Sequence, residues 1–168
     1  MDKCIIDGKK LIMEGTTIMF RNFSGRPTPY DSVGGKRRFC IPLLDSEAEM
    51  LGAAGCNIKY LKPKSPEDQP LPFVSCIVNY GPYPPRIWSV MNVNGKRNVT
   101  ALTPDTVTLL DHANIQTCDI ILSMSPNKRN PGQICLYVDQ LYAVIQNDYF
   151  AEKYAIEDDD DDDEMPFA

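Results

Sequence analysis

The sequence has very little of what an enzyme active site needs. Its 168 residues include one histidine, His112. No segment matches a phosphate-binding P-loop, a zinc-protease helix, a nucleophile elbow or a dinucleotide-binding glycine loop. A lone histidine inside an expected helix is more often a packed or surface residue than a general base. We therefore expect a protein that is not an enzyme.

Clustered cysteines and long apolar runs are also missing. The six cysteines are scattered, with none in a C-x-x-C pair or beside the histidine, and four lie in apolar runs, as small core residues do. We expect no disulfide framework, no metal site and no cofactor. No apolar run approaches a membrane span, and the first residues lack a signal-peptide pattern. These absences predict a soluble, cytoplasmic protein.

What the sequence does have is an unusual distribution of charge. Glu157, six consecutive aspartates and Glu164 are followed by Met165, Pro166, Phe167 and Ala168. Eight adjacent carboxylates repel one another and would have to be desolvated together in a core. We therefore expect one folded domain over residues 1–156 and a disordered acidic tail over residues 157–168.

Without this tail the chain is mildly basic. The sequence holds 17 Lys and Arg, all before the tail, and 23 Asp and Glu, of which the tail contains eight. Fifteen acids then remain against 17 cations, so the body carries a formal charge of about +2. A basic body with an acidic tail is typical of a protein that binds polyanions and whose tail can cover the same surface.

Segments rich in β-branched and aromatic residues alternate with Gly- and Pro-rich loops, without the regular βαβ order of a parallel fold. The pattern predicts a mostly β, antiparallel barrel with short helical insertions, although a sandwich shares these features. Asn94-Gly95 predicts a hairpin turn. Short helices are expected to begin at Asp45 and Thr103, with a final turn at 147–154. The expected strands are 17–23, 37–44, 56–61, 73–80, 86–92, 118–125 and 133–146, of which the last is long enough to bend or to pair twice.

Cations and aromatic rings recur side by side on the expected strands. Single-stranded nucleic acid needs both, because each base offers a face for stacking and each linkage carries a phosphate. The alternative is that the rings belong to the core and the charges solvate ordinary sheet faces. The pairs are Arg21 with Phe23, Arg37 with Phe39, Lys59 with Tyr60, and Arg86 with Trp88.

Three of the expected turns also carry pairs of cations, which in a barrel could surround a groove. These pairs are Arg26 and Lys36, Lys96 and Arg97, and Lys128 and Arg129. The candidate phosphate contacts are therefore Arg21, Arg26, Lys36, Arg37, Lys59, Arg86, Lys96, Arg97, Lys128 and Arg129. The candidate stacking residues are Phe23, Tyr60 and Trp88.

The end of the tail carries a resemblance to a known family. Its sequence Asp160-Asp161-Asp162-Asp163-Glu164-Met165-Pro166-Phe167 resembles the acidic tip of bacterial single-stranded-DNA-binding proteins, which end in aspartates followed by Ile-Pro-Phe. Met165 stands at the isoleucine position, Pro166 and Phe167 match, and Ala168 follows where the family chain ends. The stretches 18–25 and 103–111 are similar to phage-encoded proteins of the same function.

The resemblance implies an OB-like barrel that binds single-stranded DNA without sequence preference in phage DNA replication, recombination or repair, in the cytoplasm of a bacterial host. It also implies that the tip at residues 160–167 recruits replication and recombination proteins. The sequence leaves open the oligomeric state, including a homo-oligomer, and the choice between DNA and RNA. Two alternatives are a protein-binding inhibitor or DNA mimic that binds no nucleic acid, and an assembly protein whose tail serves only solubility.

Overall fold

The computed structural model describes residues 1–29 and 32–146, and within them ten strands form one sheet, accompanied by one α-helix and one 3-10 helix. The acidic tail and the helical turn expected at 147–154 lie outside the described residues. The strands are β1 (Lys3–Asp7), β2 (Lys10–Thr16), β3 (Met19–Asn22), β4 (Arg37–Pro42), β5 (Lys59–Leu61), β6 (Leu71–Val78), β7 (Arg86–Val93), β8 (Lys96–Leu102), β9 (Ile115–Pro126) and β10 (Ile134–Ile145), and the helices are α1 (Asp45–Ala53) and η1 (Val107–Asp111).

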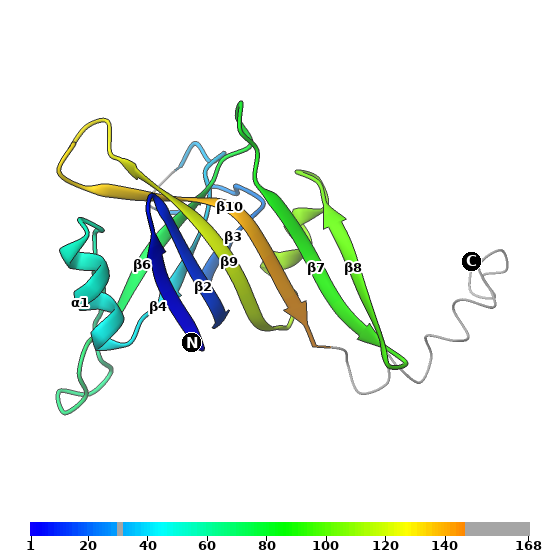
Figure 1. Ribbon diagram of the computed structural model, residues 1–168, viewed down its shortest axis with the longest axis horizontal. Coiled ribbons are helices and arrows are strands. Elements are labelled where there is room, and N and C mark those ends of the chain that lie inside the picture. The colour runs from blue at the N-terminus through cyan, green and yellow to red at the C-terminus, as the bar shows by residue number, and fades with distance from the viewer. Residues whose placement is uncertain (30–31, 147–168) are drawn as a thin grey trace, which may run out of the picture.

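The long strand β10 organises the sheet, and it pairs along both edges (Figure 1). One edge pairs antiparallel with β9 over the whole strand. The other edge pairs in parallel, first with β6 at residues 136–137 and then with β7 at residues 140–145. A register shift between Val138 and Gln140 marks a bulge at Asp139, where the parallel partner changes. The expectation that this segment pairs twice is confirmed.

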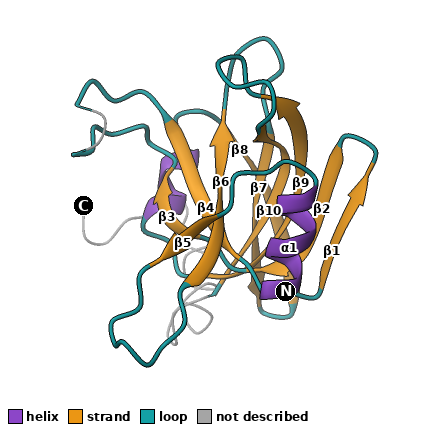
Figure 2. Cartoon of the chain, turned by 90° about the vertical axis from the view of Figure 1, so that its left-hand side faces the viewer, coloured by secondary structure: helices purple, strands orange, loops and turns teal. Residues whose placement is uncertain are grey.

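The two parallel ladders divide the sheet into two wings. The main path runs β1-β2-β9-β10-β6-β4-β3, with β5 added to β6, whereas β7 and β8 form a two-stranded wing on the second half of β10. The end strands β1 and β3 do not pair, so the sheet is not closed. Figure 2 shows it curled, with α1 lying in front between β6 and the β1–β2 hairpin.

The prediction of a mostly β fold with short helical insertions is confirmed. The sheet differs from a wholly antiparallel one because β6 and β7 both run parallel to β10. The Gly- and Pro-rich segment 79–85 connects β6 to β7 without reversing the chain direction. Both strands therefore pair in parallel with β10, one after the other. Loop composition predicts where a strand is interrupted, but not whether the next strand turns back.

The N-terminal hairpin is absent from the predicted strands. β1 pairs antiparallel with β2 around Gly8, whose φ of 62° a residue with a side chain rarely adopts. Ile5 and Ile6 are adjacent, which obscures the alternation by which a strand is recognised. The helix predicted to begin at Thr103 is a 3-10 helix that begins at Val107, with Thr106 at its N-terminal cap position. The Thr103 hydroxyl accepts a hydrogen bond from the Thr106 amide at 3.2 Å in the turn before it.

The core fills the inward face of the curled sheet. Phe23 and Phe39 are fully buried and their rings stack, with centroids 5.2 Å apart at 21°. Leu51 of α1 and Leu110 of η1 join the same cluster, so both helices cover the inward face. Truncating a buried aromatic of this kind typically costs about 3–5 kcal/mol, and this stack therefore ties β4 to the loop after β3.

Candidate nucleic-acid interface

The bulge at Asp139 decides which side chains of β10 face outward. Before the bulge the even-numbered residues are buried in the core, and after it the odd-numbered residues are. The buried set is Leu136, Val138, Leu141 and Ala143. The opposite set, which we call the outward face of β10, is Cys135, Tyr137, Gln140 and Tyr142.

An aromatic stack between β7 and β10 lies on this face. Trp88 is the register partner of Tyr142, and their rings lie 4.4 Å apart at 12°. The guanidinium carbon of Arg86 lies 5.9 Å from the centre of the Trp88 ring. The stack therefore combines a partly exposed π surface with an exposed cation, which are the two groups that a stacked nucleotide requires.

Two adjoining clefts lie beside the stack, along the outward face of β10. Their volumes are about 430 and 480 Å³, and they share Lys10, Tyr83 and Asp139. One extends to Tyr137, and the other reaches Arg86. Because these three residues line both clefts, the clefts form a continuous groove from Tyr137 to Arg86, whose guanidinium lies over the Trp88 ring.

The carboxylate in the groove is neutralised by its neighbours. Lys10 forms an ion pair with Asp139, and the Ser123 hydroxyl lies 2.8 Å from both oxygens of that carboxylate. The Lys10 ammonium also donates to the Ser123 hydroxyl at 2.8 Å. An unpaired carboxylate would repel phosphate, so this pairing makes the groove compatible with an anionic ligand.

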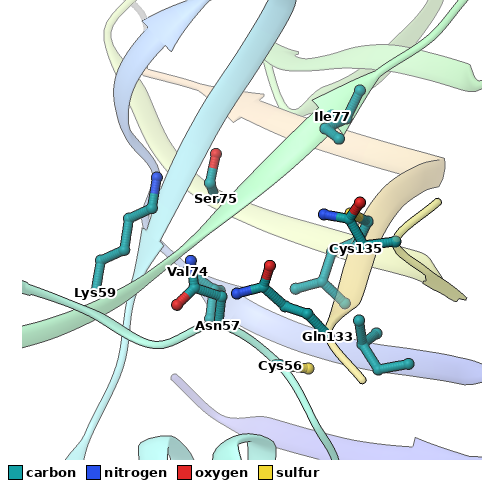
Figure 3. Close-up of a pocket in the computed structure, with 11 residues that line it drawn as sticks. Cys56, Asn57, Lys59, Val74, Ser75, Ile77, Gln133 and Cys135 are labelled. Atoms are coloured by element: carbon teal, nitrogen blue, oxygen red, sulfur yellow. The ribbon is translucent and has the colours of Figure 1, made fainter. Parts of the chain in front are cut away.

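A third, smaller pocket of about 130 Å³ lies at the start of β10 (Figure 3). Ser75 and Ile77 come from the outward side of β6, and Cys135 comes from β10. The carboxamides of Asn57, Asn127 and Gln133 and the ammonium of Lys59 complete its polar lining. Ile77 is the register partner of Tyr137, so this pocket and the groove lie on the same face of the sheet.

Several predicted site residues lie along this face. Arg86 and Trp88 lie together at the aromatic stack, and Lys59 lines the small pocket. Lys128 and Arg129 are exposed in the β9–β10 loop, between two residues that line the same pocket. Arg97 on β8 is exposed and pairs with Asn92, which puts it on the same side of the wing as Trp88, whereas Lys96 ends the β7–β8 turn.

The predicted pair of Arg21 and Phe23 is wrong as a binding site. Phe23 is fully buried, and the Arg21 guanidinium donates to the carbonyls of Leu110 at 2.9 Å and Ala113 at 2.6 Å. The cause is an irregularity in β3, where Phe20 has a φ of 52° and the register shifts. Alternation through 17–23 is lost, so sequence spacing gives the wrong faces.

Two further predicted phosphate contacts are engaged within the fold. Arg26 forms an ion pair with Asp111 at 3.0 Å, and Arg37 donates to the Pro104 carbonyl at 2.7 Å. The Arg37 guanidinium also lies over the ring of Tyr80 at 5.0 Å. Its predicted partner Phe39 belongs to the core. These arginines hold the loops around η1 and β4, while Lys36 is exposed before β4.

Lys59 and Tyr60 do not act as a pair. Lys59 is opposite the partly exposed Phe73, whereas Tyr60 is opposite the buried Pro72, so adjacent residues of β5 point to opposite faces. Tyr60 is 61% exposed. Tyr60, predicted as a stacking residue, therefore lies on the face of the sheet opposite the groove.

Sequence reasoning missed the residues that join the groove together. Tyr137 and Tyr142 lie on β10 and Lys10 lies on β2, all far from Trp88 in the sequence. Strand pairing brings Tyr142 beside Trp88, and it brings Lys10 beside Ser123 of β9, the neighbour of β10. Tyr83, which is 93% exposed, lies in a segment predicted only as a strand break. The alternation within 133–146 contained a signal for Tyr137 and Tyr142, but the bulge between them obscured it.

The described residues include no group of three or more His, Cys, Asp or Glu side chains that could hold a metal ion. Burial raises the pKa of the Cys118 thiol to about 12 and that of Cys4 to about 11, so neither is a reactive thiolate at neutral pH. No helix in the described part of the chain has the length and apolar character needed to cross a membrane.

Asp111 holds the loop after β3 against η1. Its side chain is only 2% exposed and accepts hydrogen bonds from the amides of Phe23 at 2.6 Å and Ser24 at 3.2 Å. Burial acts to raise the pKa of this carboxyl, but the hydrogen bonds from Ser24 and Phe23 and the charge of Arg26 outweigh it, and the pKa is lowered.

A lowered pKa makes this contact sensitive to acid. A carboxyl whose pKa is lower in the folded state stabilises the fold above its unfolded-state pKa, and this stabilisation is lost as the pH falls through the folded-state pKa. We expect the free energy of unfolding to fall below about pH 4, and to fall less steeply in Asp111→Asn. Urea unfolding between pH 3 and 7 measures both slopes, and equal slopes would contradict the assignment.

Comparison with known proteins identifies the family of this chain. A family model described as "Putative phage ssDNA-binding domain" matches residues 2–165. No curated protein matches the chain significantly. Among solved structures, the single-stranded DNA-binding protein from bacteriophage Enc34 in complex with ssDNA is 9% identical, with 83% of this chain and 88% of that chain covered and a TM-score of 0.46. A C-terminal truncation of the bacteriophage Enc34 protein is 10% identical, with 86% and 88% covered and a TM-score of 0.43. Since the family model spans nearly the whole sequence, this chain belongs to the phage single-stranded-DNA-binding domain family.

Proposed function

We propose that this protein binds single-stranded DNA, without general sequence preference, along the outward face of β10. The observation that carries the proposal is the stack of Trp88 on Tyr142 with Arg86 beside it. Membership of the family supports the ligand class, and the continuous groove supports the path. The proposed role is binding rather than catalysis.

The groove offers both interactions that such binding needs, base stacking and phosphate neutralisation. A base stacked on an aromatic ring contributes about 1–3 kcal/mol, and each neutralised phosphate releases counterions from the strand. Trp88, Tyr137 and Tyr83 supply ring surface at successive points, and Arg86 supplies charge at one end. Lys59, Lys128 and Arg129 supply charge at the other end, near the small pocket.

We further propose that the protein coats single-stranded DNA during phage replication or recombination and that its acidic tail has two roles. The eight carboxylates at residues 157–164 are complementary to the cations around the groove, so the tail would compete with DNA when DNA is absent. When DNA fills the groove, Met165, Pro166 and Phe167 would be released to bind partner proteins. This proposal rests on the sequence of the tail and on charge complementarity.

Trp88 makes the proposed binding site directly measurable. It is the one tryptophan of the sequence, so its fluorescence reports on this site alone. We expect oligo-dT to quench this fluorescence at low salt, because a base stacks on the Trp88–Tyr142 pair. In Tyr142→Ala, affinity measured by fluorescence anisotropy of a labelled oligo-dT should fall about five- to 100-fold.

The matched control is Tyr60→Ala, which removes a more exposed ring from the opposite face and should leave the affinity unchanged. Absence of both quenching and a gel shift at low salt would contradict DNA binding. That result would favour the alternative of an inhibitor or DNA mimic that contacts only proteins.

Deleting residues 157–168 tests the competition. Without the acidic run, the groove cations are free for phosphate, so we expect tighter binding of oligo-dT at low salt and a smaller difference at high salt. A chain with the eight carboxylates changed to their amides but with Met165 to Ala168 retained should behave like the deletion. Unchanged or weaker binding by either variant would exclude the tail as a competitor.

A further inference from the structure

The pocket at the start of β10 differs from the rest of the groove in its chemistry. Tyr83 and Tyr137 line the groove, whereas no aromatic side chain of the described residues lines the pocket. The polar groups of the pocket are the Ser75 hydroxyl, the Lys59 ammonium and three carboxamides. The carboxamide of Asn127 accepts a hydrogen bond from the Arg129 amide at 2.9 Å, which leaves those of Asn57 and Gln133. Neither carboxamide makes a hydrogen bond to the described part of the chain. Figure 3 shows the Gln133 carboxamide extending toward Asn57, whose own carboxamide lies on the side of Lys59, with Ser75 above them.

Carboxamides suit a ligand that presents donors and acceptors together. Asn and Gln side chains carry one carbonyl acceptor and two N–H donors, so each of them can both donate to and accept from the edge of one nucleobase. The other walls are apolar, with Ile77 and Ile134 in contact with the cavity. Apolar walls with a few convergent polar groups are typical of a site that orients one planar ring.

The size of the pocket limits which base fits. Its volume is about 130 Å³, close to a cavity of about 150 Å³ that holds a single benzene ring. One six-membered ring therefore fills this space, whereas the fused rings of a purine are too large to be enclosed by it. Lys59 lines the pocket, and Lys128 and Arg129 are exposed in the loop between its lining residues Asn127 and Gln133, so cations are available for the phosphates on either side of an inserted base.

We propose that this pocket holds one pyrimidine base of the bound strand and reads its edge through Asn57 and Gln133. The inference rests on the proposed function, because the strand must follow the outward face of β10 to bring a base here. Cys135 in the pocket and Tyr142 in the stack are seven residues apart on one strand, about 23 Å at about 3.3 Å per residue. One position of an otherwise unselective site would then favour pyrimidines.

The test compares homopolymers of equal length on the full chain and two variants. Affinities of oligo-dT, oligo-dC and oligo-dA are measured by fluorescence anisotropy for the parent, for Asn57→Ala with Gln133→Ala, and for Gln116→Ala. The last changes an exposed carboxamide on β9 outside the pocket and serves as the control. Thermal unfolding establishes that all three proteins are folded.

We expect the parent to prefer both pyrimidine oligomers over oligo-dA, and the double variant to lose about fivefold in pyrimidine affinity for each hydrogen bond removed. Its affinity for oligo-dA should stay unchanged, since a purine does not enter the pocket. The control should retain the parent's preference.

Three results would overturn the inference: a parent without pyrimidine preference, a double variant that keeps it, or an equal loss for all three oligomers. Equal loss would mean that Asn57 and Gln133 contact the strand without reading a base. Failure of the parent to bind any oligomer is a different result, which would refute the proposed function itself.

Discussion

The fold depends on one constraint, which is that β10 is hydrogen-bonded along both edges while its parallel partner changes halfway. A single twelve-residue strand holds β9 on one side and two successive strands, β6 and β7, on the other. The bulge at Asp139 permits the change, because an extra residue bends the strand and shifts its side-chain alternation by one. Without that shift, Leu141 and Ala143 would face solvent and Tyr142 would enter the core.

The same shift creates the candidate site. It keeps Tyr137 and Tyr142 on the outward face on either side of the bulge, and it leaves Asp139 beside Lys10 and Ser123 in the groove. The parallel ladder then places Trp88 beside Tyr142, so a ring pair forms between strands that are distant in the sequence. Fold and site are therefore consequences of one irregularity in one strand.

This origin explains what the sequence could and could not predict. Arg86 and Trp88 were predicted correctly as a pair on one face because β7 has regular alternation, a property of neighbouring residues. Phe23 was assigned to the wrong environment because Phe20 has a positive φ and β3 is irregular, which composition does not reveal. Tyr142 was missed because its role depends on which strand lies beside β10, and strand order is a property of the whole chain. The strand limits themselves were close to those observed for β4, β7 and β10, where apolar runs end at Gly, Pro or Asn.

The proposed path of single-stranded DNA is the outward face of β10. Ultraviolet cross-linking of the full chain to an oligo-dT that carries 5-bromouracil, followed by peptide mapping, tests it most directly. If DNA follows this face, cross-links form at Trp88, Tyr142 and Tyr137, and none form at Tyr60 on the opposite face. Cross-links concentrated at Tyr60 or on β1, with Trp88 and Tyr142 unmodified, would contradict it.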